Sequence, residues 1–193
     1  MKPNIPAPAA VSLRPSPVWR SYAGGRVLRA FRGVAGSVDD HFPEDWLAST
    51  VQARNGSNSQ GPNEGLSLIG ASSDPLSLAE CLQQNPAFWF GPQNANRTRT
   101  NVLWKLLDSS VRLQFQAHPS ADYARKHLNS NAGKTECWYI LGSRGDACVY
   151  LGFQNPPSRE AWARMIREQR VEEMVDCFER IPVQPGDCYV VPA

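Results

Sequence analysis

Apolar and polar residues alternate with a period of two in Val111-Arg-Leu-Gln-Phe-Gln116-Ala-His118. This pattern predicts a β-strand with one apolar face and one polar face. Gln116 and His118 are two residues apart, so their side chains leave the predicted strand on the same face. Glu136 follows Lys134 at the start of the next strand-like run. An amide oxygen, an imidazole and a carboxylate are ligands that zinc or another borderline divalent metal accepts.

Spacing alone leaves two interpretations of these residues open. In the first, Gln116, His118 and Glu136 bind one metal ion and leave further positions for water and substrate. In the second, Gln116 and His118 lie on a solvent-exposed face, and Glu136 pairs with Lys134. Because a single histidine is a weak metal signal, spacing by itself favours the second interpretation.

Composition excludes several classes of protein. The 193 residues carry a formal net charge of +2 with scattered basic residues, which argues against a nucleic-acid surface. No stretch approaches the roughly 20 apolar residues that a membrane helix needs. The five cysteines are widely spaced and lack a C-x-x-C motif, which favours reduced thiols in a cytoplasmic protein. The 16 prolines indicate many turns and favour a β-rich fold over a helical bundle.

Local patterns predict short elements on both sides of the central strand. The runs at 137–141 and 147–153 are rich in β-forming residues and flank Gly142-Ser-Arg-Gly145-Asp146, so they predict a hairpin. Gln184-Pro-Gly-Asp187 predicts a type II turn. The other predictions are a Pro-rich leader at 1–17 and strands at 18–20, 26–28 and 188–191. Helices are predicted at 76–85 with Ser77 as N-cap, at 120–127, and after Ser158.

A set of motifs spans most of the chain. These motifs are Gln116-Ala-His118-Pro119, Tyr123-Ala124, Gly133-Lys-Thr-Glu136, Leu103–Asp108, Pro17-Val-Trp19, Gly24-Gly25, Glu44–Ser49, Gly186-Asp187 and Val191-Pro-Ala193. Together they resemble the type I mannose-6-phosphate isomerases, a family of zinc-dependent enzymes with the cupin fold, a jelly-roll β-barrel. That family shows a Q-x-H-P run, a nearby Tyr-Ala pair and a G-K-x-E segment that enters a strand.

The resemblance implies a β-rich chain, all-β with a few helices, that forms a cupin-like jelly-roll barrel as a single domain at 18–193. It implies that Gln116, His118 and Glu136 bind one Zn²⁺ per chain. It further implies that Lys134 acts in catalysis, by proton transfer or charge stabilisation, and that Lys105 binds the substrate phosphate. For Lys105, an ordinary surface lysine is an equally good interpretation. The implied reaction interconverts mannose 6-phosphate and fructose 6-phosphate, so the expected partner is a small-molecule sugar phosphate.

Some positions depart from the family pattern. Ser120-Ala121 replaces an acidic pair and Gln114 replaces a small polar residue, which indicates a changed substrate pocket. The family's remaining histidine ligand follows its P-A-G segment, whereas this sequence stops at Ala193. His41 and His127 are better explained as a loop histidine and a helix-surface histidine. We therefore expect the N-terminal portion of an isomerase, truncated before the final barrel strands, with weak metal binding and little activity.

Two alternative functions remain open. A catalytically inactive cupin-like protein that binds or senses sugars would suit the altered positions and the missing ligand. A metal-dependent cupin that acts on another carbonyl or hydroxy substrate is the other, because one fold hosts many chemistries. Neither a nucleic-acid partner nor membrane association is expected, and the sequence carries no signal for an oligomeric state.

Overall fold

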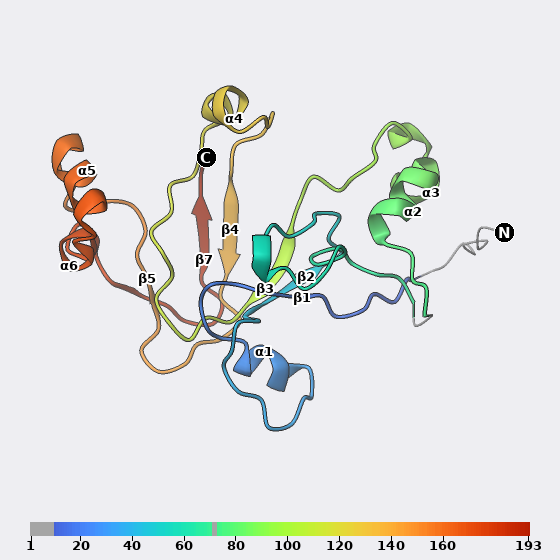
Figure 1. The fold of residues 1–193 in the computed structure, drawn as a ribbon, viewed down its shortest axis with the longest axis horizontal. Helices are drawn as coiled ribbons and strands as arrows, with labels where there is room; N and C mark the ends of the chain where they lie inside the picture. Colours follow the sequence, from blue (N-terminus) through green and yellow to red (C-terminus); the bar gives the residue numbers. More distant parts are fainter. Residues whose placement is uncertain (1–9, 71–72) are drawn as a thin grey trace. The chain divides into compact units, whose positions relative to one another are not determined.

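The computed structural model describes residues 10–70 and 73–193, and Figure 1 shows their fold. The chain divides into two compact units, Met1–Gln114 and Phe115–Ala193. Residues 1–9 of the predicted Pro-rich leader lie outside the described residues, and the rest of the leader runs into the first strand. A single domain at 18–193 stays a prediction.

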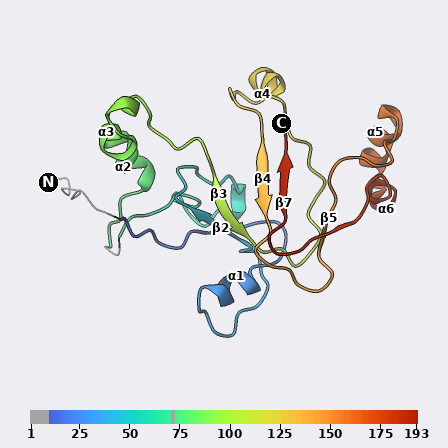
Figure 2. The ribbon, with the colours of Figure 1, turned by 180° about the vertical axis from the view of Figure 1, so that it is seen from behind.

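Three short antiparallel strands form the sheet of the first unit, in the order β1-β2-β3. They are β1 at Pro17–Val18, β2 at Glu44–Leu47 and β3 at Trp104–Leu107. Strands β2 and β3 lie side by side in both views (Figures 1 and 2). The register places Trp46 opposite Lys105. Strand β2 is central, and its first three side chains are buried.

One small hydrophobic cluster of the first unit lies next to the central strand, apart from other buried side chains such as Leu78 and Leu82. It consists of the buried side chains of Val18, Trp46 and Ala53, with the partly buried Leu103 packed against them. Because this cluster is small, polar contacts carry much of the order around β2, including those of its buried carboxylates Glu44 and Asp45.

The predicted helix at 76–85 is confirmed as α2, Leu78–Gln84. Ser77 is its N-cap, as predicted, and forms a capping box that was not predicted: the Glu80 N–H donates to Ser77 Oγ at 3.1 Å, and the Glu80 carboxylate accepts the Ser77 N–H at 2.9 Å. Helix α3, Pro86–Phe90, follows directly. Two 3₁₀ turns, Gly56–Asn58 and Pro92–Asn94, complete the helical elements described in this unit.

The predicted strand at 26–28 is wrong, because these residues begin helix α1, Arg26–Phe31. Gly25 precedes the helix in the left-handed conformation. The carboxylate of Asp108 accepts the N–H groups of Val27 and Leu28 at 2.7 and 3.3 Å. Free N–H groups at a helix start require such a partner. This partner is 80 and 81 residues away in sequence, so the local pattern could not indicate it.

Gly25→Ala should destabilise the first unit more than Gly33→Ala. Both glycines flank α1 and have positive φ, +92° and +79°. A Cβ at Gly25 would lie 2.4 Å from the carbonyl oxygen of Phe42, whereas a Cβ at Gly33 would meet nothing within 4 Å. We expect a loss of about 1 kcal/mol for Gly33→Ala from the backbone alone, and roughly 2–3 kcal/mol for Gly25→Ala. Urea unfolding of the two variants measures the difference, and equal losses would refute the steric argument.

The second unit contains two pairs of antiparallel strands. Strand β4, Glu136–Tyr139, pairs with β7, Cys188–Val191, and the two lie side by side in Figures 1 and 2. Strand β5, Cys148–Val149, pairs with β6, Ile181–Pro182. The predicted hairpin joining 137–141 to 147–153 is therefore wrong, because each run pairs with a later strand. A run of β-forming residues can indicate a strand, but it does not identify the strand's partner.

Three helices accompany these strands. Helix α4, Ala121–His127, and helix α5, Arg159–Glu168, confirm the helices predicted at 120–127 and after Ser158. The hydroxyls of Ser120 and Ser158 accept backbone N–H groups at the two helix starts, and only the cap at Ser158 was predicted. Helix α6, Val171–Val175, follows α5. The predicted turn before β7 is also confirmed. The Asp187 N–H donates to the Gln184 carbonyl at 3.1 Å, and Gly186 has φ +98°.

Residues 111–118, predicted as a strand, belong to no strand in the described part of the chain. An aromatic cluster in the second unit nevertheless fixes this segment. Phe115 contacts Trp162 of α5 and Phe178, with ring centroids 6.0 and 5.5 Å apart. Phe153 packs against the same two rings at 5.0 and 4.7 Å. These ring contacts fix the position of Phe115 and therefore also constrain Gln116, the next residue.

The prediction of a strand-based chain with a few helices is confirmed, but the sheets that the structure describes form no closed barrel. Across residues 10–70 and 73–193, no helix is both long and apolar enough to cross a bilayer.

Candidate metal centre

The second unit brings the segment that carries Gln116 and His118 against the start of β4. The Lys134 backbone N–H donates to the carbonyl oxygen of Pro119 at 3.1 Å. Gly133 permits this close approach, because a Cβ there would lie 2.8 Å from the same oxygen. The contact fixes Lys134 and Glu136 beside the segment that carries the other two predicted site residues.

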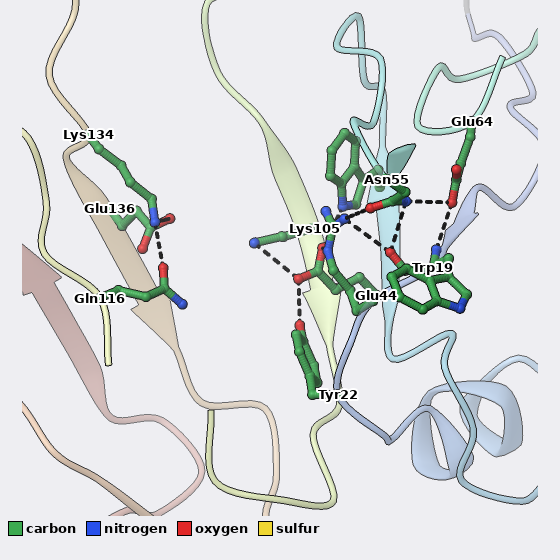
Figure 3. A network of polar contacts seen from close by, with 11 residues as sticks. Trp19, Tyr22, Glu44, Asn55, Glu64, Lys105, Gln116, Lys134 and Glu136 are labelled. Atoms are coloured by element: carbon green, nitrogen blue, oxygen red, sulfur yellow. Dashed lines mark hydrogen bonds and ion pairs between the residues drawn. The ribbon is translucent and has the colours of Figure 1, made fainter. Parts of the chain in front are cut away.

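Four predicted side chains meet at this point. His118 Nε2 lies 3.2 Å from Glu136 Oε2. The Lys134 ammonium donates to Gln116 Oε1 at 2.9 Å and lies 3.4 Å from Glu136 Oε1. Figure 3 shows Lys134 extending to Gln116 with Glu136 beside it. The two oxygen atoms that could bind a metal, Gln116 Oε1 and Glu136 Oε1, therefore both already contact the Lys134 ammonium.

The carboxylate of Glu136 is oriented by a residue that the sequence did not assign to the site. Trp138 Nε1 donates to Glu136 Oε2 at 3.3 Å. The two residues are two apart on strand β4, so they share a face. The two-residue spacing of Glu136 and Trp138 is visible in the sequence, but it did not indicate a role for the Trp138 indole. Glu136 Oε2 thus lies between an indole donor and the imidazole.

The arrangement fits a divalent metal. Two ligand atoms about 2.0–2.1 Å from a tetrahedral metal are about 3.3 Å apart, close to the 3.2 Å between His118 Nε2 and Glu136 Oε2. The His118 side chain is only 8% exposed, and its Nδ1 is buried with no hydrogen-bond partner in the described part of the chain. Within residues 10–70 and 73–193, no three His, Cys, Asp or Glu side chains form a metal cluster, so a metal at this point would need the amide of Gln116 as its third ligand.

The other two histidines take the places expected of them. His127 lies exposed at the end of α4 and stacks on Tyr123, with ring centroids 4.5 Å apart. His41 lies in the first unit, where its Nδ1 is 2.8 Å from the Arg20 carbonyl oxygen and its ring stacks on Trp19. Both have partners that explain their presence without a metal.

Lys105 belongs to the first unit and is not part of the cluster around His118. Its ammonium lies 3.4 Å from Glu44 Oε1. The same carboxylate accepts hydrogen bonds from Tyr22 Oη at 2.5 Å and Trp46 Nε1 at 2.7 Å, and pairs with Arg20 Nε at 3.0 Å. Figure 3 shows Glu44 between Tyr22 and Lys105. The sequence singled out Lys105 but missed this buried carboxylate.

The charge state of Glu44 follows from these contacts. Burial disfavours the ionised carboxylate, but Lys105, the hydrogen bonds from Tyr22 and Trp46, and Arg20 together hold the pKa of Glu44 below its ordinary value. The pKa of Tyr22 is raised by burial and by the nearby Glu44 carboxylate. Glu44 is therefore an ionised carboxylate that holds Lys105 in place, which leaves Lys105 only partly available to a substrate.

No family model matches the chain. It is 39% identical over 94 residues to the probable mannose-6-phosphate isomerase GmuF of Bacillus subtilis, and 38% identical over 95 residues to the mannose-6-phosphate isomerase ManA of the same organism. These matches cover 48% and 49% of the chain but only 28% and 29% of the two relatives.

A solved structure agrees with these relatives. The crystal structure of the mannose 6-phosphate isomerase from Bacillus subtilis matches with a TM-score of 0.68 and 25% identity, over 95% of this chain and 52% of that chain. The chain thus spans about half the length of the solved isomerase. The resemblance to mannose-6-phosphate isomerases that the motifs indicated is confirmed.

Proposed function

We propose that this chain is part of a zinc-dependent aldose–ketose isomerase that interconverts mannose 6-phosphate and fructose 6-phosphate. The observation that carries the proposal is the meeting of Gln116, His118, Glu136 and Lys134 in one cluster. The similarity to mannose-6-phosphate isomerases supplies the reaction and the substrate. The same proposal has three further parts. We propose a single domain from residue 18 onward, a cupin barrel that is closed by strands outside this sequence, and a cytoplasmic location.

In this proposal Gln116, His118 and Glu136 hold one Zn²⁺. Bound zinc supplies a Lewis acid that polarises the substrate carbonyl and hydroxyl oxygens. Trp138 fixes the rotamer of Glu136 through its hydrogen bond to Oε2, and Lys134 is held within reach of the same donors. The Trp138 contact orients Glu136 before the metal arrives, whereas the Lys134 ammonium has to leave Gln116 Oε1 and Glu136 Oε1 for these atoms to bind zinc.

The reaction moves a proton between two adjacent sugar carbons through a cis-enediol. We assign Lys134 to the substrate oxygens, where its N–H groups stabilise the negative charge that develops or transfer a proton. Lys105, restrained by Glu44, is assigned to the substrate phosphate. Because Lys105 is paired with Glu44, we expect replacement of Lys105 to weaken substrate binding by a smaller factor than replacement of Lys134 slows turnover.

The direct test combines metal analysis with an isomerase assay on the purified protein extended through the proposed remaining strands, because the 193 residues alone are expected to bind metal weakly and to have little activity. Zinc content is measured by inductively coupled plasma mass spectrometry, and interconversion of mannose 6-phosphate and fructose 6-phosphate by a coupled assay. About one zinc per chain with interconversion supports the proposal. Tightly bound zinc without interconversion would reject the isomerase and favour a cupin with another substrate.

Lys134→Met should lower kcat for the sugar-phosphate interconversion by about 10²-fold, the lower end for a lost acid–base group. Zinc content should stay the same or rise, because the ammonium no longer occupies Gln116 Oε1 and Glu136 Oε1. Lys126→Met, an exposed lysine of α4, is the matched control and should keep both properties. Equal activity in the two variants would remove Lys134 from the mechanism.

One observation favours the inactive sugar-binding alternative. The Lys134 ammonium contacts both Gln116 Oε1 and Glu136 Oε1, so the cluster has an internal cation. If this protein binds sugar phosphates without zinc, calorimetry should detect binding of mannose 6-phosphate in the presence of a chelator. Binding that requires added zinc would instead favour the isomerase.

A further inference from the structure

Two cysteines that are far apart in sequence meet on the β4–β7 sheet. Cys137 lies opposite Val190, and Cys188 lies opposite Tyr139. Residues two apart on a strand share a face, so this register puts both cysteines on the same face of the sheet. Their Sγ atoms are 3.4 Å apart, and both residues are exposed.

We propose that Cys137 and Cys188 form a reversible dithiol–disulfide pair, a modification site oxidised by low-molecular-weight disulfides such as glutathione disulfide. The inference goes beyond the proposed isomerase and does not depend on it. Its basis is the position of the two thiols: a disulfide requires about 2.05 Å between sulfurs, which side-chain rotation from 3.4 Å can approach on one sheet face.

The remaining cysteines lack this combination of exposure and proximity. Cys81 and Cys177 are buried, and burial raises the pKa of the Cys81 thiol. Cys148 is only partly exposed and lies on strand β5, in the other strand pair of the unit.

The chemistry proceeds in two exchanges that balance without a further reactant. A cysteine thiolate, formed by loss of its proton to solvent, attacks glutathione disulfide, forms a mixed disulfide and releases one glutathione thiolate. The second cysteine then attacks the mixed disulfide at the protein sulfur, closes the Cys137–Cys188 bond and releases the second glutathione. The protein loses two electrons, one molecule of glutathione disulfide gains them, and the two protons end on the two glutathiones.

The new bond would join two strands without touching the candidate metal ligand. Cys137 and Glu136 are neighbours on β4, so their side chains leave opposite faces. A covalent link between β4 and β7 closes a loop across 51 residues of sequence. Such a link restricts the unfolded chain and should raise the thermal midpoint of the second unit by several degrees.

The test is oxidation of the purified protein in buffers of increasing glutathione disulfide to glutathione ratio. Free thiols are then alkylated and the digest is examined by mass spectrometry. We expect a Cys137–Cys188 linked peptide that disappears on adding dithiothreitol, together with a higher thermal midpoint. Failure to find the linked peptide at any ratio would overturn the proposal, as would stable glutathione adducts on both cysteines.

Two variants distinguish this pair from general thiol oxidation. Cys188→Ser leaves Cys137 without its partner, so the variant should accumulate a glutathione adduct at Cys137 instead of an intramolecular link. Cys148→Ser is the control and should give the same linked peptide in the same yield as the unmodified sequence. A yield about tenfold lower in the Cys148→Ser protein would show that Cys148, and not the sheet pair, mediates the oxidation.

Discussion

Replacing His118 by alanine should remove zinc from the full-length isomerase proposed above. Apparent binding energies of about 10–16 kcal/mol are shared among three or four ligands in protein zinc sites, so one lost ligand costs roughly 3 kcal/mol, more than a hundredfold in Kd. His118 is the only nitrogen donor of the proposed set, and its Nε2 is 3.2 Å from Glu136 Oε2. Zinc content after dialysis and competition titration with a chromophoric chelator measure the change.

The control for this prediction is His127→Ala. His127 is exposed at the end of α4 and contacts Tyr123, so its loss should leave zinc content unchanged. Because His118 is buried, far-UV circular dichroism must show that its alanine variant keeps its fold. A folded His118→Ala protein that retains a full equivalent of zinc would refute the ligand assignment.

The candidate site illustrates what local sequence can and cannot indicate. Alternation in 111–118 wrongly predicted a strand, yet Gln116 still contacts Lys134 and His118 still contacts Glu136. The reason is that Phe115 is anchored in an aromatic cluster and the Lys134 N–H binds Pro119. The alternation of apolar and polar residues indicates which side chains are expected to share a face of the segment. It does not report whether a neighbouring strand is present to form hydrogen bonds.

Helix starts were predicted more reliably than strand partners. Ser77, Ser120 and Ser158 each accept a backbone N–H three residues on, a contact that depends only on nearby residues. The partner of β4 depends on residues about 50 positions later. For the same reason the meeting of Cys137 with Cys188 could not be read from spacing, and neither could the contacts of Glu44.

Glu44→Ala should destabilise the first unit by about 3–5 kcal/mol, the range for breaking a buried ion pair by removing one partner. The Glu44 side chain is 4% exposed and joins Arg20 and Lys105. It also accepts hydrogen bonds from Tyr22 and Trp46. Alanine would leave two cations and two donors without their shared acceptor. Urea unfolding at neutral pH measures the loss. Tyr22→Phe, which removes one hydrogen bond to the same carboxylate, should cost only about 1–2 kcal/mol.

Lowering the pH should remove the stabilising effect of the Glu44 carboxylate. The pKa of Glu44 is lower in the folded protein than its ordinary value, so its stabilising effect is complete above the unfolded pKa of about 4.3. That effect is lost as the pH falls through the folded pKa, because the folded state must then take up a proton against Lys105 and Arg20. Glu44→Gln lacks this titration, so the difference in unfolding free energy between the original protein and the variant should shrink below pH 4.3. A difference that stays constant from pH 7 to pH 3 would show that packing, and not charge, accounts for the effect of Glu44.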